Sequence, residues 1–87
     1  MTLKMANTSA NIVALMEHLA KALVEKTDEV FAEAFDEKGE TVIELEVAES
    51  DVGRLIGRQG RMARSLRTIM NAAALRTRKR YVLEIVE

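Results

Sequence analysis

Three of the four glycines in this chain lie within eight residues, at positions 53, 57 and 60. Glycine accepts backbone angles that a side chain penalises, and two glycines bound the segment Gly57-Arg58-Gln59-Gly60. The chain has no proline and no other stretch as rich in glycine, so nothing resembles a linker between domains. The segment therefore predicts a tight turn inside one domain, with the other elements arranged around it.

The residues before this turn predict a helix followed by a hairpin. Apolar side chains recur at helical spacing over residues 9–26, with Thr8 and Ser9 as N-cap residues. Residues 30–35 and 41–47 favour two strands joined by a turn. Alternation in the second strand predicts a buried face of Ile43, Leu45 and Val47 and an outward face of Val42, Glu44 and Glu46.

Two helices and a strand are predicted around and after the glycine segment. Ser50 and Asp51 can cap a short helix that ends near Leu55, and a longer helix runs from Gly60 to about Thr77. Residues 81–86 are rich in β-forming side chains and predict the last strand. The longer helix has an apolar stripe of Met62, Leu66, Ile69, Met70 and Ala73, with Arg61, Arg64, Arg67 and Asn71 toward solvent.

A chain of 87 residues can bury one modest core, so we expect a single domain. It has no cysteine, and burial rather than disulfides must therefore supply its stability. Three strands cannot bury their apolar face alone, so helices must cover one side of the sheet. We predict an α+β fold of order helix, strand, strand, helix, helix, strand, with residues 1–10 a polar arm and 11–87 the folded domain.

The net charge of −1 hides a strong asymmetry along the chain. The first 50 residues contain four lysines and eleven acids, whereas residues 51–81 contain eight arginines and one lysine against Asp51 alone. Scattered arginines usually do no more than solvate helix faces, but these cluster around the glycine turn. The second half is therefore predicted to face an anion.

The glycine turn has the chemistry of a phosphate site. Unpaired N–H groups at the start of the helix after Gly60 attract anions, and glycines leave room for a phosphodiester to approach. Arg58, Gln59 and Arg61 would surround the phosphate with donors, and Arg54 and Arg64 lie within reach along the sequence. The apolar residues Val52, Leu55 and Ile56 precede the turn, and each can belong either to the surface beside it or to the core, with Ile56 better suited to the core.

The run Val52-Gly53-Arg54-Leu55-Ile56-Gly57-Arg58-Gln59-Gly60-Arg61-Met62 resembles the KH signature, an apolar-Ile-Gly-x-x-Gly loop between two helices. The element order is similar to the type II KH topology. Residues 11–86 together resemble the KhpA (YlqC) family of small bacterial KH proteins, in which the stretch 49–53 and the pair Lys79-Arg80 have counterparts. The polar arm and the side chains Met62 and Leu66 depart from the usual KH pattern.

The resemblance implies that the chain binds single-stranded RNA in the cytoplasm, as an RNA chaperone or post-transcriptional regulator linked to growth and envelope synthesis. The implied contacts are Arg54, Leu55, Ile56, Gly57, Arg58, Gln59, Gly60, Arg61 and Arg64. It also implies a homodimer, or a heterodimer with a KH protein of the KhpB (Jag) kind. An exposed face around Phe31, Phe35 and Val42 is one option for that contact.

Two other functions compete with RNA binding. An enzyme is not expected, because His18 is the one histidine and no nucleophile–base constellation, metal-ligand set or cofactor motif occurs. No segment is apolar and long enough to span a membrane. The stronger rival is a KH scaffold that serves mainly for dimerisation or protein contact, with RNA secondary.

Overall fold

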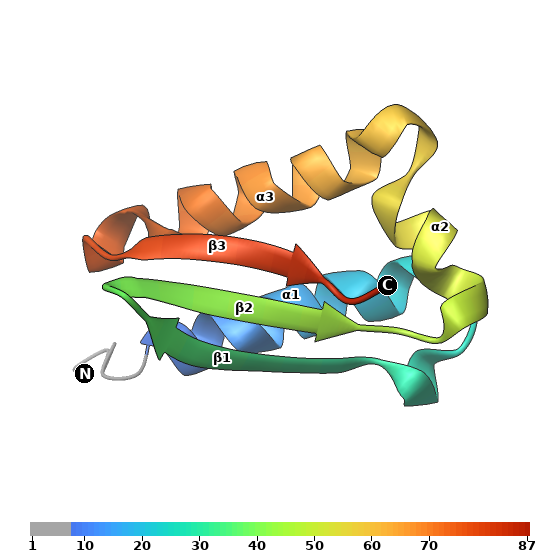
Figure 1. Ribbon diagram of the computed structural model, residues 1–87, viewed down its shortest axis with the longest axis horizontal. Coiled ribbons are helices and arrows are strands. Elements are labelled where there is room, and N and C mark those ends of the chain that lie inside the picture. Colours follow the sequence, from blue (N-terminus) through green and yellow to red (C-terminus); the bar gives the residue numbers. More distant parts are fainter. Residues whose placement is uncertain (1–7) are drawn as a thin grey trace, which may run out of the picture.

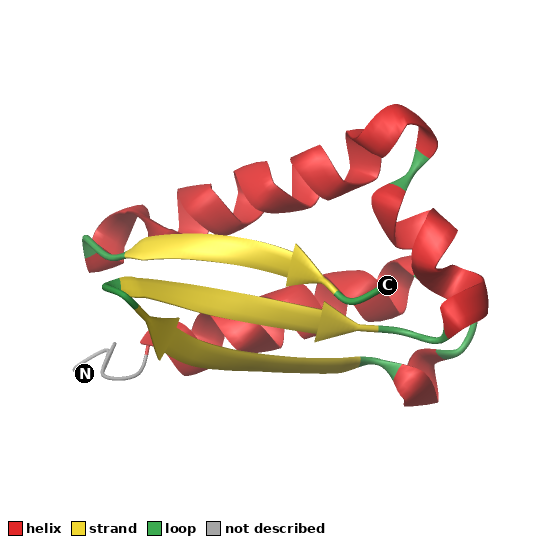
Figure 2. Cartoon of the chain, viewed as in Figure 1, coloured by secondary structure: helices red, strands yellow, loops and turns green. Residues whose placement is uncertain are grey.

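The computed structural model describes residues 8–87 of the chain, which fold in the order α-β-β-α-α-β (Figures 1 and 2). The main elements are α1 (Thr8–Leu23), β1 (Phe31–Glu37), β2 (Glu40–Glu46), α2 (Val52–Ile56), α3 (Arg61–Ala74) and β3 (Arg80–Ile85). Short 3-10 turns occupy Thr27–Glu29, Glu49–Asp51, Arg58–Gly60 and Leu75–Thr77. The predicted α+β fold and its element order are confirmed.

The three strands form one sheet in the order β1-β2-β3. β1 and β2 are antiparallel and are joined by Lys38 and Gly39, which both have positive φ angles (50° and 81°), as a two-residue type I′ turn requires. β2 and β3 are parallel. Parallel neighbours need a crossover connection, and here α2 and α3 provide it. The crossover brings β3 beside the helix pair.

α1 and α3 cover the same face of this sheet (Figure 1). The fully buried Met16 of α1 and the buried Leu66 and Met70 of α3 pack against Ile43 and Leu45 of β2. The opposite face stays open, since Phe31 is 62% exposed and Phe35 39%. The predicted sheet with one covered face is therefore confirmed.

Val42 and Ile69 differ from expectation. Val42 lies on the open face but is only 7% exposed, because Phe35 and Val82 stand beside it in the same cross-strand row and cover it. Ile69 is 42% exposed, and the core-facing stripe of α3 consists instead of Ala63, Leu66, Met70 and Ala74. At 3.6 residues per turn, Ile69 lies about a quarter turn from the centre of this stripe and therefore reaches the surface.

The predicted caps also act differently. Asp51 occupies the N-cap position of α2, but its carboxylate accepts hydrogen bonds from the backbone N–H groups of Glu25 (3.2 Å) and Lys26 (3.0 Å). Ser9 lies inside α1, where its hydroxyl pairs with the Tyr81 hydroxyl at 3.0 Å. α1 begins at Thr8, so residues 8–10 of the expected arm are helical, and residues 1–7 lie outside the described part of the chain.

Candidate nucleic-acid interface

The glycine segment joins α2 to α3 through a strained backbone. Gly57, Gln59 and Gly60 have φ angles of 76°, 56° and 73°. A Cβ added to Gly57 would lie 2.7 Å from the Met62 Cβ and 2.8 Å from the Met62 backbone nitrogen. Because real Cβ atoms do not approach backbone this closely, Gly57 is required by packing as well as by its φ angle.

Gly60 differs from Gly57 in its surroundings. It occupies the N-cap position of α3 in a left-handed conformation, and a Cβ there would meet nothing within 4 Å. Its own N–H donates to the Gly57 carbonyl at 3.1 Å, which closes the loop. The first turn of α3 follows directly, and N–H groups at a helix start favour negative charge. A phosphate can therefore approach the loop at Gly60 without steric hindrance.

A groove of about 510 Å³ opens beside this loop, between α2, the first turns of α3 and the end of β3. Its apolar lining residues are Ile56, Ala63, Leu83 and Ile85. On the side of the loop and α3 it is lined by Gln59, Gly60, Arg64 and Arg67, and on the β3 side by Glu84 and Glu87. The groove thus has an apolar lining, one cationic wall and one acidic wall.

The two walls suit different parts of a nucleotide. Arg64 donates from Nη2 to the Gln59 carbonyl at 3.3 Å, which holds its guanidinium over the loop, and Arg67 follows one helical turn later. Guanidinium groups bind phosphate, whereas carboxylates repel it and accept hydrogen bonds from base amino groups. A strand in this groove would therefore place its backbone along α3 and its bases toward β3.

The structure distributes the nine candidate residues over several environments. Ile56, Gln59, Gly60 and Arg64 line the groove together. Arg58 and Arg61 are exposed on the loop and on the first residue of α3, outside the groove lining. Leu55 is fully buried in the core, so it supports the site from below rather than at the surface. Ile56, for which the sequence favoured the core, lines the groove instead, and Leu55, for which both places were open, lies in the core.

Arg54 points away from the groove. Its guanidinium forms an ion pair with Glu25, and its Nε lies 3.3 Å from Asp51 Oδ1. These contacts link α2 to the connection after α1. In this arrangement Arg54 stabilises the base of the helix pair instead of facing a phosphate.

Several groove residues were missed by sequence reasoning. Arg67 follows Arg64 by three residues on the same helix face, a signal that the sequence does contain. Leu83 and Ile85 enter the groove because β3 pairs in parallel with β2 and lies next to α3. No local pattern in residues 80–85 predicts that neighbour.

Asp51 anchors the helix pair from below. Its side chain is 2% exposed, and the hydrogen bond from the Lys26 N–H is the main reason why the pKa of this carboxyl lies below its ordinary value of 3.8. Burial opposes the decrease, while the Glu25 N–H and the charge of Arg54 add to it. The carboxylate therefore stays ionised, and it ties the start of α2 to the end of α1.

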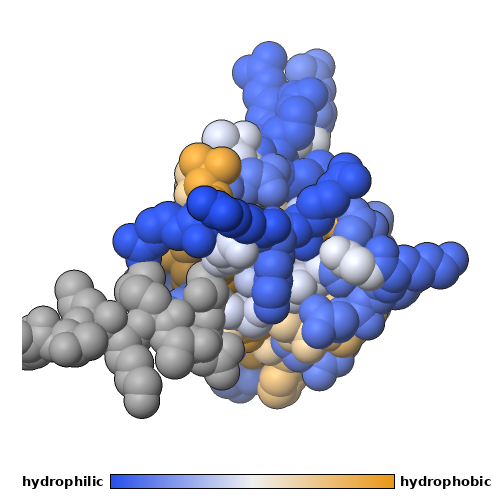
Figure 3. Space-filling model, turned by 90° about the vertical axis from the view of Figure 1, so that its left-hand side faces the viewer, coloured by the Kyte–Doolittle hydropathy of each residue, from blue (hydrophilic) through white to orange (hydrophobic). Residues whose placement is uncertain are grey.

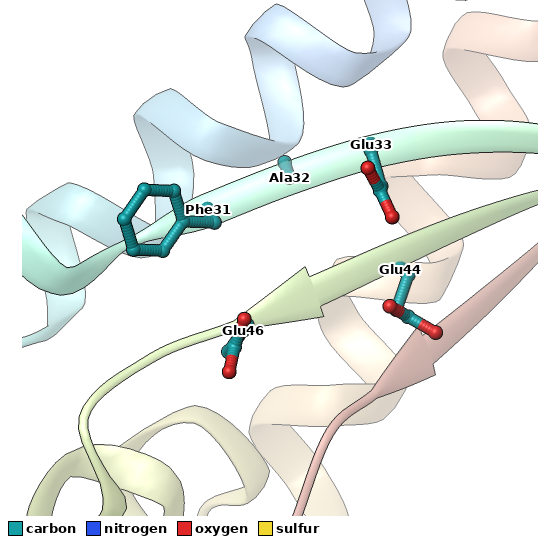
Figure 4. Close-up of a pocket in the computed structure, with 5 residues that line it drawn as sticks. All are labelled: Phe31, Ala32, Glu33, Glu44 and Glu46. Atoms are coloured by element: carbon teal, nitrogen blue, oxygen red, sulfur yellow. The ribbon is translucent and has the colours of Figure 1, made fainter.

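A second hollow of about 300 Å³ lies on the open face of the sheet and has acidic side chains but no cationic wall (Figure 4). Phe31 stands at one end of it, and Glu33, Glu44 and Glu46 line the rest. Glu33 pairs across the strands with Glu44, which in turn pairs with Glu84. A row of carboxylates repels phosphate. The open sheet face is therefore unsuited to nucleic acid.

Within residues 8–87, no group of three or more His, Asp or Glu side chains is arranged to hold a metal ion. No helix of that region is long and apolar enough to cross a membrane.

A Gly-x-x-Gly loop between two helices, beside a groove and a sheet in the order α-β-β-α-α-β, defines a type II KH domain. The comparison with family models agrees, because the model described as "KhpA/KhpB, KH domain" matches residues 13–85. The chain belongs to this KhpA/KhpB family of KH domains.

Relatives at about the same level of identity occur in distant bacteria, and each is called "RNA-binding protein KhpA". The chain is 44% identical to the protein of Borreliella burgdorferi, over 88% of this chain and 94% of the relative. It is 43% identical to that of Clostridium acetobutylicum, over 83% and 96%, and 44% identical to that of Aquifex aeolicus, over 84% and 92%. No solved structure matched the chain.

Proposed function

We propose that this protein binds single-stranded RNA, with the RNA backbone held at Gly57-Arg58-Gln59-Gly60 and the bases in the adjoining groove. The observation that carries the proposal is the position of Gly60. Its missing side chain leaves open space at the start of α3, beside a groove with an apolar lining and Arg64 and Arg67 on one wall. Backbone and bases would thus each meet a surface of suitable chemistry.

The composition of the groove indicates how such binding would work. Its apolar residues are aliphatic, so bases would pack on the half-buried Ile56 and Ile85, with the buried Leu83 beneath them, rather than stack on aromatic rings. The loop of a KH domain clamps about four nucleotides. Phosphate contacts position a strand but carry little sequence information. We expect weak binding with a loose sequence preference, and affinity that falls as salt is added.

The cellular role that we propose is that of an RNA chaperone or post-transcriptional regulator in the cytoplasm. The names of the relatives, which describe RNA-binding proteins, support the RNA part of this proposal. Loose sequence preference suits a protein that contacts many RNAs. We propose no catalytic activity, because the groove presents binding groups and no nucleophile–base pair.

The loop can be tested with the double substitution Arg58→Asp and Gln59→Asp. Arg58 is exposed, and Gln59 has a left-handed φ that aspartate tolerates, so we expect the variant to fold. Fluorescence anisotropy with a short single-stranded RNA at two salt concentrations should show at least a tenfold loss of affinity, because acids repel phosphate. The circular dichroism spectrum should not change.

Lys38→Asp is the matched control. It also replaces a cation by aspartate at a positive φ, but in the β1–β2 turn, where Asp-Gly is a favoured sequence. It should bind RNA almost as the wild type does. Equal binding by the loop variant and the wild type, with both folded, would reject the loop as the RNA site and favour the protein-contact scaffold instead.

We also propose that the chain pairs with a second copy or with a KH protein of the KhpB kind. The open sheet face is a poor surface for self-pairing, because the row Glu33, Glu44 and Glu84 would oppose its own copy. The middle of the outer face of α3 is exposed and uncharged at Ser65, Thr68, Ile69 and Ala72, between the exposed Arg61 at its start and Arg76 beyond its end. The middle of that face places no like charges opposite one another, and we therefore favour it over the face around Phe31 and Phe35.

A further inference from the structure

We propose that the RNA path continues beyond the loop, along the seam between α3 and β3, to a second phosphate-binding point at residues 76–80, called here the basic turn. This proposal rests on the proposed RNA binding and deepens it. It assigns the far end of α3 to the same RNA strand, at a site separate from the Gly-x-x-Gly loop.

A further hollow, of about 350 Å³, lies at the end of α3 away from the loop. It is lined by Asn71, Ala74, Leu75, Arg78, Lys79, Arg80 and Tyr81. Together, the α3-side residues of the two hollows recur at helical spacing, as Gly60, Ala63, Arg64, Arg67, Asn71, Ala74, Leu75 and Arg78. The steps are three or four residues, apart from the adjacent pairs Ala63-Arg64 and Ala74-Leu75, and within α3 this spacing keeps them on one side of the helix. Both hollows therefore lie along the same side of α3.

β3 supplies the opposite wall of both hollows. Its start, at Arg80 and Tyr81, borders the distal hollow, and its end, at Leu83 to Ile85, borders the groove at the loop. In Figure 1, β3 and α3 run side by side in opposite directions, so the two hollows lie at the two ends of one seam. Arg67 lines the groove and Asn71 lines the distal hollow, so the two hollows approach each other within about one turn of α3.

The length of the seam exceeds what the loop alone can use. The 14 residues of α3 span about 20 Å at the α-helical rise. Stacked nucleotides advance by about 3.4 Å each, so this length accommodates about six of them. Since a KH loop clamps about four, a strand that follows α3 from the loop would reach the basic turn with its next nucleotides.

Hydrogen bonds of the Thr77 hydroxyl to the backbone hold the basic turn, and the cationic side chains of Arg78 and Lys79 take no part in them. Thr77 Oγ1 donates to the Ala74 carbonyl at 2.8 Å and accepts the Lys79 N–H at 3.0 Å, and Arg78 has a left-handed φ of 59°. Among the described residues, no ion pair involves Arg78 or Lys79. Arg80 lies 3.7 Å from Glu40. The exposed side chains of Arg78 and Lys79 are thus the two cations that can bind phosphate here.

The same end of the molecule also offers apolar contact for a base. Leu75 is 78% exposed, the most exposed of the large apolar side chains in the described region, and it lines the hollow beside Asn71. Figure 3 looks at this end and shows strongly hydrophilic side chains projecting around a smaller hydrophobic patch. A nucleotide would find cations for its phosphate, an amide for its base edge and an aliphatic surface for its ring.

The experiment compares RNAs of four and twelve nucleotides, for the wild type and for the double variant Arg78→Asn with Lys79→Glu. Asparagine tolerates the left-handed φ of residue 78, so the turn is preserved. In anisotropy titrations the variant should bind the four-nucleotide RNA as the wild type does and the twelve-nucleotide RNA about tenfold more weakly. Its salt slope on the longer RNA should fall by about 1.4, for two lost phosphate contacts.

The control is Lys21→Glu, on an exposed part of α1 away from the seam, which should leave both affinities nearly unchanged. Equal loss on the two RNAs, or no loss on either, overturns the extended path while leaving the loop site intact. If wild-type protein binds neither RNA, the proposed function fails, and the extended path fails with it. Binding of an acidic protein at the basic turn, without any length-dependent RNA effect, would likewise overturn it.

Discussion

At the scale of single residues, glycine is required at the two loop positions for different physical reasons. Both have a positive φ, but only Gly57 also lacks room for a side chain. A Cβ at Gly57 would lie 2.7 Å from the Met62 Cβ. Gly60 faces open space, where we place the phosphate. Stability and binding should therefore respond differently to the same substitution at the two positions.

We expect Gly57→Ala to lower the free energy of unfolding by about 3 kcal/mol or more, from left-handed strain and displacement of Met62 together. Gly60→Ala should cost about 1–2 kcal/mol from strain alone. Urea denaturation followed by circular dichroism measures both values. Similar losses in the two variants would contradict this assignment of roles.

RNA binding by the Gly60→Ala variant gives the complementary readout. Its new methyl group would occupy the space proposed for phosphate, so affinity should fall by about tenfold in protein that remains folded. An unchanged affinity would indicate that the backbone of the RNA lies elsewhere on the loop.

At the scale of elements, α3 performs two tasks on two sides. Ala63, Leu66, Met70 and Ala74 face the core, and the adjacent face, which carries Arg64, Arg67 and Asn71, forms the wall of the seam. α2 is only five residues long and cannot be stable by itself. Asp51 contributes to the stability of α2, because its hydrogen bonds join the start of this helix to the segment after α1.

Replacing Asp51 by asparagine should destabilise the fold in a pH-dependent way. The pKa of Asp51 is lower in the folded state, so its contribution is complete above the unfolded value near 3.8 and is lost as pH falls through the folded pKa. The free energy of unfolding of wild type and Asp51→Asn should therefore differ most near neutral pH and converge in strong acid. Urea titrations at about pH 7 and about pH 3 test this. A difference that does not depend on pH would exclude the carboxylate charge as the cause.

At the scale of the whole molecule, charge is sorted between two surfaces. Carboxylates cross all three strands on the open sheet face, and most arginines lie on the loop, α3 and the basic turn. The overall charge of −1 is a total over the whole chain and describes neither surface. The arrangement directs a polyanion to the α3 side and discourages it from the sheet.

The exposed apolar residues allow a test of self-pairing. We expect Ile69→Asp to convert a dimer to a monomer, because a charge would be placed in the uncharged middle of the outer face of α3. The double variant Phe31→Ser with Phe35→Ser changes the sheet face instead and should remain dimeric. Sedimentation equilibrium measures the mass of each. A monomer from the sheet variant and a dimer from Ile69→Asp would move the interface to the sheet.

The sequence by itself determined the order of elements, the single core and the position of the loop. These follow from local physical rules, such as the alternation of Ile43 and Leu45 in a half-buried strand and the left-handed angles at Gly57 and Gly60. The phosphate-binding part of the candidate site could be predicted for the same reason, since the loop and its arginines are contiguous in the chain.

Only the tertiary structure decided which side chains share the groove. Leu83 and Ile85 join Ile56 because β3 pairs in parallel with β2 after a crossover, and no residue pattern specifies that neighbour. Arg54 does not line the groove, because its guanidinium pairs with Glu25, which is distant in the sequence, and with the buried Asp51. Leu55 and Ile56 are adjacent apolar residues, and the direction in which a five-residue helix packs placed one in the core and the other at the surface.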